Sequence, residues 1–111
     1  MTINEYQNKA LRTANGGITA VPGSINGGLG LCGESGECAD LVKKHIFQGH
    51  DLDRNHLAKE LGDVAWYLAV TAHLIGYDLE SIFEMNITKL MERYPEGFDS
   101  NRSLHRQTGD I

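Results

Sequence analysis

The sequence has few of the residues that build a disulfide framework, a membrane span or a nucleic-acid-binding surface. Its two cysteines, Cys32 and Cys38, form no C-x-x-C motif, and we expect them to be buried or half-buried thiols. No apolar run approaches the roughly 20 residues of a transmembrane helix, and the N-terminus lacks the pattern of a signal peptide. A net charge of −5 argues against binding to polymeric nucleic acid. We therefore expect a cytoplasmic protein that binds neither membranes nor nucleic-acid chains.

The composition is that of an ordinary globular protein, with 41% hydrophobic and 23% charged residues. A length of 111 residues predicts a single domain over residues 1–111. This is near the size at which one hydrophobic core is workable but small. Burial of apolar surface between subunits would therefore add useful stability.

Helical periodicity begins at the N-terminus. Residues 2–14 are predicted to form a first helix, because Thr2 and Glu5 have the spacing of a capping box and Asn15-Gly16 supplies a stop. The following residues 16–28 are predicted to be a loop. This loop holds the sequence ITAV, which resembles a short strand and is ended by Pro22-Gly23.

Three further helices are predicted with short connections between them. The second covers residues 26–48 with a stop at Gly49, the third begins after Asp51 or Asp53 and ends at Gly76, and the fourth ends before Pro95. Each has an apolar stripe at spacings of three and four residues. The prediction is an all-α, four-helix, bundle-like fold with a core over residues 26–95 and a polar tail over residues 96–111.

The stretch GGLGLCGESGECAD at residues 27–40 permits two interpretations. Gly28, Gly30 and Gly33 match the G-x-G-x-x-G spacing of a dinucleotide-binding turn. That turn requires a parallel sheet, which this sequence cannot build, so the interpretation fails. In a helix, each interior glycine costs up to about 1 kcal/mol relative to alanine. We expect close approach of a neighbouring helix or of a ligand to offset this cost, with Gly33 as the test position.

Acidic residues form the second pattern in this region. Glu34 and Glu37 are one helical turn apart, and Glu60 and Asp63 repeat the spacing on the next helix. Two helices packed by their apolar faces would bring these carboxylates together, and a divalent cation would remove their mutual repulsion. Oxygen ligands favour Mg²⁺ or Mn²⁺ over zinc. The alternative is a set of solvated acids paired with lysines, which are Lys43, Lys44 and Lys59.

The fourth helix carries a complementary cationic face. Asn86, Lys89 and Arg93 recur at spacings of three and four residues, and Asn86 falls within the apolar stripe. Lys89 and Arg93 could contact phosphate, since a guanidinium binds phosphate oxygens in pairs. The alternative is an ordinary salt-bridged face, for example between Lys89 and Glu92.

Histidines and the single tryptophan give weaker signals. His45 is predicted to be a core residue, and His50 and His56 lack metal-ligand spacing. Trp66 lies off the main stripe of the third helix, which suggests a second packing surface such as a subunit contact.

Three segments together resemble one known family. They are GLGLCGESGECADLVKK, KELGDVAWYLA and NITKLMERYPEGF. The motif E-x-x-E followed by E-x-x-D, with the closing K-L-x-x-R-Y-P, is similar to that of the MazG-like nucleoside triphosphate pyrophosphohydrolases, an all-α group. The likeness covers roughly residues 28–98.

The resemblance implies a Mg²⁺-dependent enzyme that converts a (deoxy)nucleoside triphosphate to the monophosphate and pyrophosphate, and that assembles as a homodimer or homotetramer. Carried over by position, the metal ligands would be Glu34, Glu37, Glu60 and Asp63. The substrate's phosphates and sugar would lie at Asn86, Lys89, Arg93 and Tyr94. Glu34 and Glu37 would be catalytic, with Glu37 the choice for the residue that activates water. A non-catalytic nucleotide-binding module and a phosphoribosyl-ATP pyrophosphohydrolase stay open as alternatives.

Overall fold

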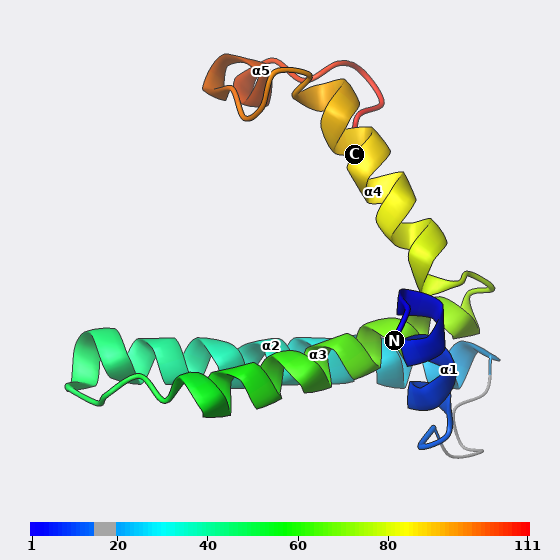
Figure 1. The fold of residues 1–111 in the computed structure, drawn as a ribbon. Helices are drawn as coiled ribbons and strands as arrows, with labels where there is room; N and C mark the ends of the chain where they lie inside the picture. The colour runs from blue at the N-terminus through cyan, green and yellow to red at the C-terminus, as the bar shows by residue number, and fades with distance from the viewer. Residues whose placement is uncertain (15–19) are drawn as a thin grey trace. The chain divides into compact units, whose positions relative to one another are not determined.

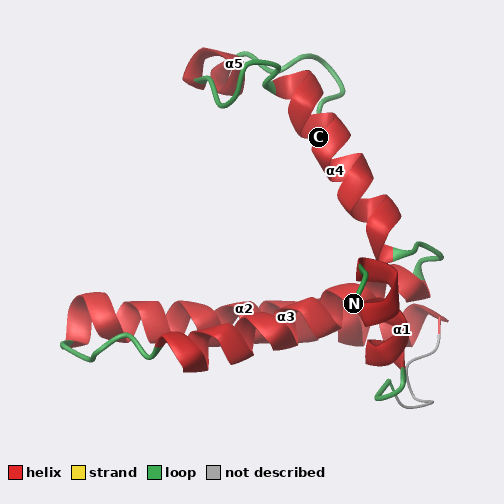
Figure 2. Cartoon of the chain, viewed as in Figure 1, coloured by secondary structure: helices red, strands yellow, loops and turns green. Residues whose placement is uncertain are grey.

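The computed structural model describes residues 1–14 and 20–111, and this part of the chain is helical without a β-strand (Figures 1 and 2). The prediction of an all-α fold is confirmed. Four main helices occur, followed by one short helix. Their bounds are α1 (Ile3–Leu11), α2 (Ala20–Gln48), α3 (Arg54–Leu74), α4 (Leu79–Arg93) and α5 (Ser100–Leu104). None of the described helices combines the length and apolar character that a membrane span needs.

The helix ends follow the predicted local signals. The Thr2 hydroxyl accepts a hydrogen bond from the Glu5 N–H group at 3.1 Å, and the Glu5 carboxylate accepts one from the Thr2 N–H group at 2.6 Å. This is the predicted capping box. Of the two candidate caps of α3, Asp53 is the one used, since its carboxylate accepts from the His56 N–H group at 2.9 Å. Gly49 and Gly76 follow α2 and α3 with positive φ angles of 72° and 85°.

Some predicted boundaries were wrong. Helix α1 ends at Leu11 rather than at residue 14, and the proposed stop at Asn15-Gly16 lies outside the described residues. Helix α2 begins at Ala20, so residues 20–25 are helical where a loop was predicted. Pro22 is compatible with this start, because N–H groups in the first turn of a helix have no partner within it.

The polar tail also contains structure that its irregular pattern did not predict. Helix α5 covers Ser100–Leu104, and the Asp99 carboxylate caps it by accepting a hydrogen bond from the Arg102 N–H group at 2.8 Å. Aspartate is a strong N-cap, so this short helix has a local cause that a search for apolar periodicity does not detect.

The chain divides into two compact units, residues Met1–Leu79 and Glu80–Ile111. In the first unit, α2 and α3 pack along each other and α1 packs on α3. The second unit contains most of α4, together with α5 and the tail. A single functional domain over the whole chain stays a prediction.

Gln7 of α1 connects three parts of the first unit. It is only 5% exposed, and its amide group donates hydrogen bonds to the carbonyl oxygens of Ala69 and Tyr77, both at 3.1 Å. Its side-chain oxygen accepts a hydrogen bond from the Leu79 N–H group at 2.9 Å. Gln7 therefore satisfies backbone groups at the end of α3, in the following turn and at the start of α4, groups that would be costly to bury unpaired.

Trp66 packs within its own chain rather than at a predicted subunit contact. Its indole N–H group donates to the Ala10 carbonyl oxygen at 3.1 Å and to the Thr13 hydroxyl at 2.8 Å, and both partners belong to the α1 region. Its ring meets the Tyr67 ring edge-on, with centroids 5.0 Å apart. The expectation of a second packing surface was correct, but α1 covers it.

His45 and Cys32 are more exposed than predicted. His45 is not a core residue, and its ring Nδ1 lies 2.8 Å from the His50 carbonyl oxygen, across the turn that ends α2. Cys38 is half-buried as expected, whereas Cys32 is exposed. The contact between His45 and His50 therefore joins the last turn of α2 to the connection that follows it.

Two glycines allow α2 and α3 to approach closely. A β-carbon at Gly30 would overlap the Tyr67 ring, and one at Gly27 would overlap the Thr71 hydroxyl. Near Gly33 and Gly36, by contrast, no described atom beyond the neighbouring residues and the backbone of α2 lies within 4 Å of an added β-carbon, so the expected helix contact at Gly33 is absent. Gly27 meets Thr71 and Gly30 meets Tyr67, so residue numbers increase along α2 in the direction in which they decrease along α3. The two helices therefore run antiparallel.

We predict that Gly30→Ala and Gly33→Ala change stability in opposite directions. At Gly33 the added methyl group meets open space, so the better helix propensity should raise the free energy of unfolding by about 0.5–1 kcal/mol. At Gly30 the methyl group should displace Tyr67 and lower the free energy of unfolding by about 1–3 kcal/mol. Urea denaturation followed by circular dichroism checks both. An equal gain in the two variants would contradict the close contact.

Candidate functional site

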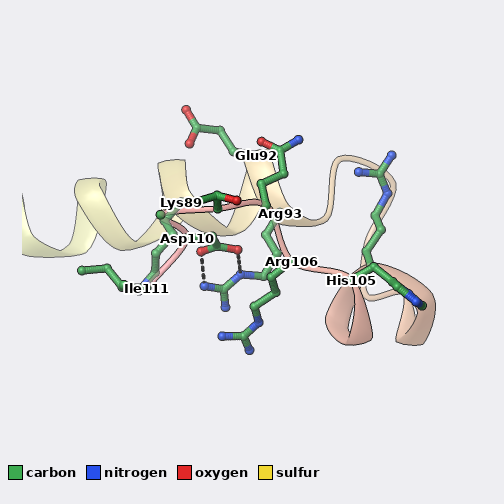
Figure 3. Close-up of a pocket in the computed structure, with 11 residues that line it drawn as sticks. Lys89, Glu92, Arg93, His105, Arg106, Asp110 and Ile111 are labelled. Carbon is green, nitrogen blue, oxygen red and sulfur yellow. Dashed lines mark hydrogen bonds and ion pairs between the residues drawn. The ribbon is translucent and has the colours of Figure 1, made fainter.

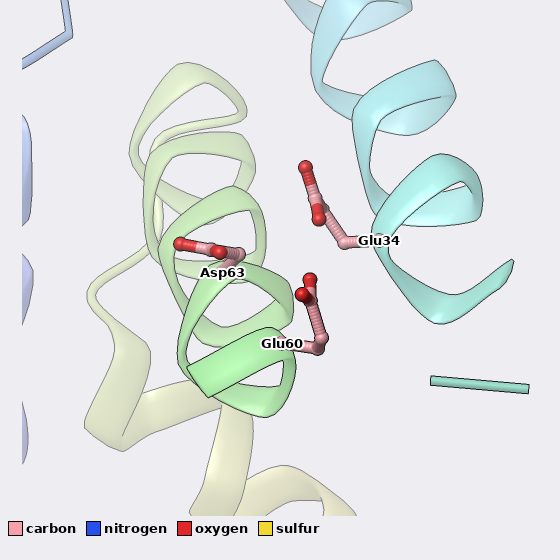
Figure 4. Close-up of side chains that lie close together, drawn as sticks. All are labelled: Glu34, Glu60 and Asp63. Carbon is pink, nitrogen blue, oxygen red and sulfur yellow. The ribbon is translucent and has the colours of Figure 1, made fainter. Parts of the chain in front are cut away.

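Three of the four predicted metal-ligating acids come together between α2 and α3. Glu34 projects from α2, while Glu60 and Asp63 project from α3 (Figure 4). One carboxylate oxygen from each lies within 4.8 Å of the others. Glu34 and Glu60 are half-buried and Asp63 is exposed. The structure thus contains a cluster of carboxylate oxygens, here called the acid cluster, that is exposed to solvent on its Asp63 side.

The register of the helix pair explains this convergence. Gly30 lies opposite Tyr67, and Glu34 follows Gly30 by four residues, so both share one face of α2. Asp63 precedes Tyr67 by four residues on α3. One turn beyond the close contact, the antiparallel pair therefore places Glu34 opposite Asp63.

The acid cluster is electrostatically unfavourable without a cation. The pKa of Glu34 is raised, first because partial burial disfavours the carboxylate and then because Asp63, Glu60 and Glu37 add negative charge around it. A cation bound at the cluster would reverse both effects by replacing lost hydration and neutralising charge.

His56 supports the acid cluster, although its spacing to other histidines gave no metal signal. Its ring Nε2 lies 2.8 Å from the Glu60 carboxylate, one helical turn away. A partner of this kind fixes the orientation of a ligating carboxylate. The spacing of four residues between His56 and Glu60 was the signal in the sequence that could have revealed it.

Tyr6 of α1 belongs to the same neighbourhood. The pKa of its hydroxyl group is raised by partial burial and then by the negative charge of Asp63. This influence of Asp63 on Tyr6 acts between α1 and α3, so local spacing in the sequence could not predict it.

Glu37 stands outside the group of three. It is exposed, and its charge contributes last to the raised pKa of Glu34. In the alternative interpretation, lysines pair with the acids of the two motifs. Lys43 and Lys44 instead bind Asp40, at 2.8 and 2.6 Å. Their hydrogen bonds lower the pKa of Asp40 to about 2.

The predicted substrate-binding residues lie on α4 and directly after it. Asn86 is exposed rather than part of a core stripe, which corrects the prediction. Arg93 binds the tail residue Asp110 instead of an acid on its own helix, with its Nε and Nη2 atoms 2.7 and 2.5 Å from the two carboxylate oxygens. The Tyr94 ring packs against Phe98, with centroids 5.3 Å apart. Lys89 and Arg93 line a cavity of about 340 Å³ (Figure 3).

Comparison with known proteins agrees with this geometry. Residues 27–98 match the model of the MazG nucleotide pyrophosphohydrolase domain. The chain belongs to the MazG family. It is also similar to the Gene 37 protein of Mycobacterium phage L5, with 33% identity over 105 residues, which cover 87% of this chain and 92% of that protein. No solved structure matches the chain significantly.

Membership of the MazG family implies a nucleotide pyrophosphohydrolase type of activity and the use of a divalent metal ion. The acid cluster fits such an ion. Its three side chains are all carboxylates, and the limit of 4.8 Å between their oxygens compares with about 4.2 Å between opposite ligands of Mg²⁺, twice its bond length of about 2.1 Å. The match covers α3, α4 and all of α2 from Gly27 onward, whereas α1 and residues 99–111 lie outside it.

We predict that Glu34→Gln weakens Mn²⁺ binding by at least about tenfold, since losing even a residue that orients a ligand typically costs 10- to 100-fold. His56→Phe should weaken it less than Glu34→Gln does. Titration of Mn²⁺ followed by electron paramagnetic resonance measures the affinity. Glu84→Gln, an exposed change on α4 with the same loss of charge, is the control. Equal affinities for Glu34→Gln and Glu84→Gln would remove Glu34 from the metal site.

Proposed function

We propose that the chain is a Mg²⁺-dependent nucleotide pyrophosphohydrolase, with Mn²⁺ as a possible substitute. It hydrolyses a (deoxy)nucleoside triphosphate between the α and β phosphorus atoms, giving the monophosphate and pyrophosphate. Its role would be to remove unwanted nucleotides or to adjust the nucleotide pool. The observation that carries this proposal is the convergence of Glu34 with Glu60 and Asp63 in a chain of the MazG family.

The acid cluster is proposed to hold the metal ion, with Glu37 as a fourth ligand from the same face of α2. When bound, a divalent cation neutralises phosphate charge and lowers the pKa of water. His56 keeps the Glu60 carboxylate oriented through their 2.8 Å contact. The half-buried positions of Glu34 and Glu60 limit their hydration, which strengthens their attraction for a cation.

Glu37 is the proposed general base. Attack of water on the α-phosphorus breaks the bond to the bridging oxygen and releases pyrophosphate and a proton. Glu37 is exposed, so one of its carboxylate oxygens can face water while the other is directed toward the metal ion. Glu34 is proposed to act with it as the second catalytic carboxylate.

Residues of α4 are proposed to bind the substrate. Lys89 and Arg93 would contact the phosphates, and Asn86 and Tyr94 would contact the sugar and adjoining phosphate. The exposure of Asn86 and the cavity lined by Lys89 and Arg93 support this assignment for these three residues, and Tyr94 follows Arg93 directly. Positive charge at these positions would stabilise the departing pyrophosphate.

We predict that the protein with Mg²⁺ converts at least one common NTP or dNTP to the monophosphate and pyrophosphate, as resolved by ion-exchange chromatography. Glu34→Gln and Glu60→Gln should each abolish turnover while the helical circular dichroism spectrum persists. Formation of the diphosphate and orthophosphate would overturn the proposed bond cleavage. Metal-dependent nucleotide binding without any product would favour the non-catalytic module. Activity on phosphoribosyl-ATP alone would favour that related enzyme.

We also propose that the protein assembles as a homodimer or homotetramer. Only Leu79 among the apolar residues of α4 is fully buried, at 3% exposure. The rest of its predicted stripe is largely exposed. The exposed members are Phe83, Ile87, Leu90 and Met91. Such a stripe suits helix packing between copies of the chain, because burying each large side chain contributes about 1.5–3 kcal/mol.

We predict that Ile87→Glu lowers the mass of the assembly in solution, because it places a charge within the proposed interface. Sedimentation equilibrium at several concentrations measures this mass. Thr88→Glu adds the same charge about 100° away around the helix and should leave the mass unchanged. If Ile87→Glu lowers only thermal stability and the mass stays the same, the stripe is covered within one chain and the proposed interface is wrong.

A further inference from the structure

The cavity at the end of α4 is built largely by residues outside the family match. Lys89 and Arg93 come from α4, whereas Arg102 and Arg106 come from α5 and the tail. All of its lining residues belong to the unit Glu80–Ile111, so the cavity exists within one compact part of the chain. Its volume of about 340 Å³ lies at the small end of the range for ligand sites, about 300–1,000 Å³.

The lining of this cavity is cationic in an acidic protein. The lining includes four cationic side chains, Lys89, Arg93, Arg102 and Arg106, and two carboxylate side chains, Glu92 and Asp110. Their side-chain charges sum to +2, whereas those of the whole chain sum to −5. Concentrating positive charge against the sign of the whole molecule creates a local field that attracts multiply charged anions. Arginine predominates in this lining, and its planar fork matches the oxygens of phosphate.

Asp110 already occupies the place that an anion would take. Its two oxygens accept hydrogen bonds from the Nε and Nη2 atoms of Arg93 (Figure 3), which is the paired geometry that a phosphate group also offers. The pKa of Asp110 is lowered, first by these hydrogen bonds and further by the positive charges of Arg106 and Lys89. Three cations therefore act on one carboxylate, and the side chains of the central pair, Arg93 and Asp110, are only 11% and 17% exposed.

We propose that this cavity is an oligophosphate-binding site, completed by Arg102 and Arg106 of the tail, in which Asp110 holds Arg93 until a phosphate group displaces it. Displacement exchanges one carboxylate for a more highly charged ligand without forming or breaking a covalent bond. The tail thus supplies both additional phosphate-binding residues and an internal competitor.

The inference rests on the proposed function, because the oligophosphate would be either the phosphate chain of the nucleotide substrate or the pyrophosphate that hydrolysis releases. Both present adjacent phosphate groups to the arginines. Binding in the absence of metal separates the cavity from the acid cluster, since carboxylates without a cation repel phosphate.

Isothermal titration calorimetry with inorganic pyrophosphate, on the full chain with EDTA present, tests the proposal. Arg102→Gln and Arg106→Gln should each weaken binding about tenfold, as expected for loss of a charged hydrogen bond. Arg12→Gln, which removes the same charge from the exposed end of α1, should bind as the wild type does. Asp110→Asn should bind pyrophosphate more tightly, and more tightly than Asp51→Asn, an exposed change of equal charge.

A second measurement follows Arg93 directly. The NMR resonance of its Nε–H group should shift when pyrophosphate is added to the wild type. The shifted position should be closer to that of pyrophosphate-bound Asp110→Asn than to that of ligand-free Asp110→Asn. No pyrophosphate binding, equal binding by Arg106→Gln and Arg12→Gln, or weaker binding by Asp110→Asn would each overturn the proposal.

Two further arms identify the source of the ligand and separate this inference from the proposed function. Tighter metal-free binding of a nucleoside triphosphate than of pyrophosphate, with the same dependence on Arg106, would identify the substrate's phosphate chain. Binding of pyrophosphate alone would identify the product. Normal hydrolysis without any such binding would overturn the proposed binding site and leave the proposed function intact. Binding without hydrolysis would support the binding site and overturn the proposed function.

Discussion

The close approach of α2 and α3 at Gly27 and Gly30 is the constraint on which the acid cluster depends. Packed helices usually keep their axes 8–10 Å apart, at a distance set by the side chains between them. At these two positions there is no side chain, and Thr71 and Tyr67 fill the space that a β-carbon would take. A carboxylate on each helix can then reach the other, one turn further along. Of the glycines that match the spacing of a cofactor turn, Gly30 therefore helps to bring the two helices together, whereas Gly28 and Gly33 meet open space.

Stability and chemistry are separated along α3. The buried hydrophobic residues are small or aliphatic, and most lie toward the C-terminal end of α3, with others in α1 and at the start of α4. The buried side chain of Gln7 forms hydrogen bonds with backbone groups in the same region. Glu60 and Asp63 lie two or more turns nearer its N-terminal end, where burial raises the pKa of Glu34 and works against folding. The buried Thr71 hydroxyl has no partner among the described residues, so it lowers the stability of the fold at the contact between α2 and α3. The packed end of α3 thus contributes stability, whereas the crowding of negative charge at its other end opposes it.

Local rules predicted what local interactions determine. The capping box at Thr2 and Glu5, the cap at Asp53 and the turn at Gly76 all depend on neighbours within a few residues. The pairing of acids on α2 and α3 was also accessible, because helical spacing determines which residues share a face. Spacing could not reveal which glycine meets the other helix, that Trp66 meets α1, or that Arg93 meets Asp110. Those contacts join positions far apart in the sequence, and several partners of suitable chemistry were available for each.

Each unit brings charged groups together in a partly buried place, carboxylates in the first unit and cationic side chains in the second. In the first, three carboxylates share a half-buried place and remain only partly compensated, since His56 contacts just one of them. In the second, the guanidinium of Arg93 is compensated by Asp110 of its own unit. The first arrangement therefore favours a cationic ligand, and the second favours an anion that can replace a carboxylate. Carboxylates without a cation repel phosphate, so the acid cluster by itself favours a cation over an anionic ligand.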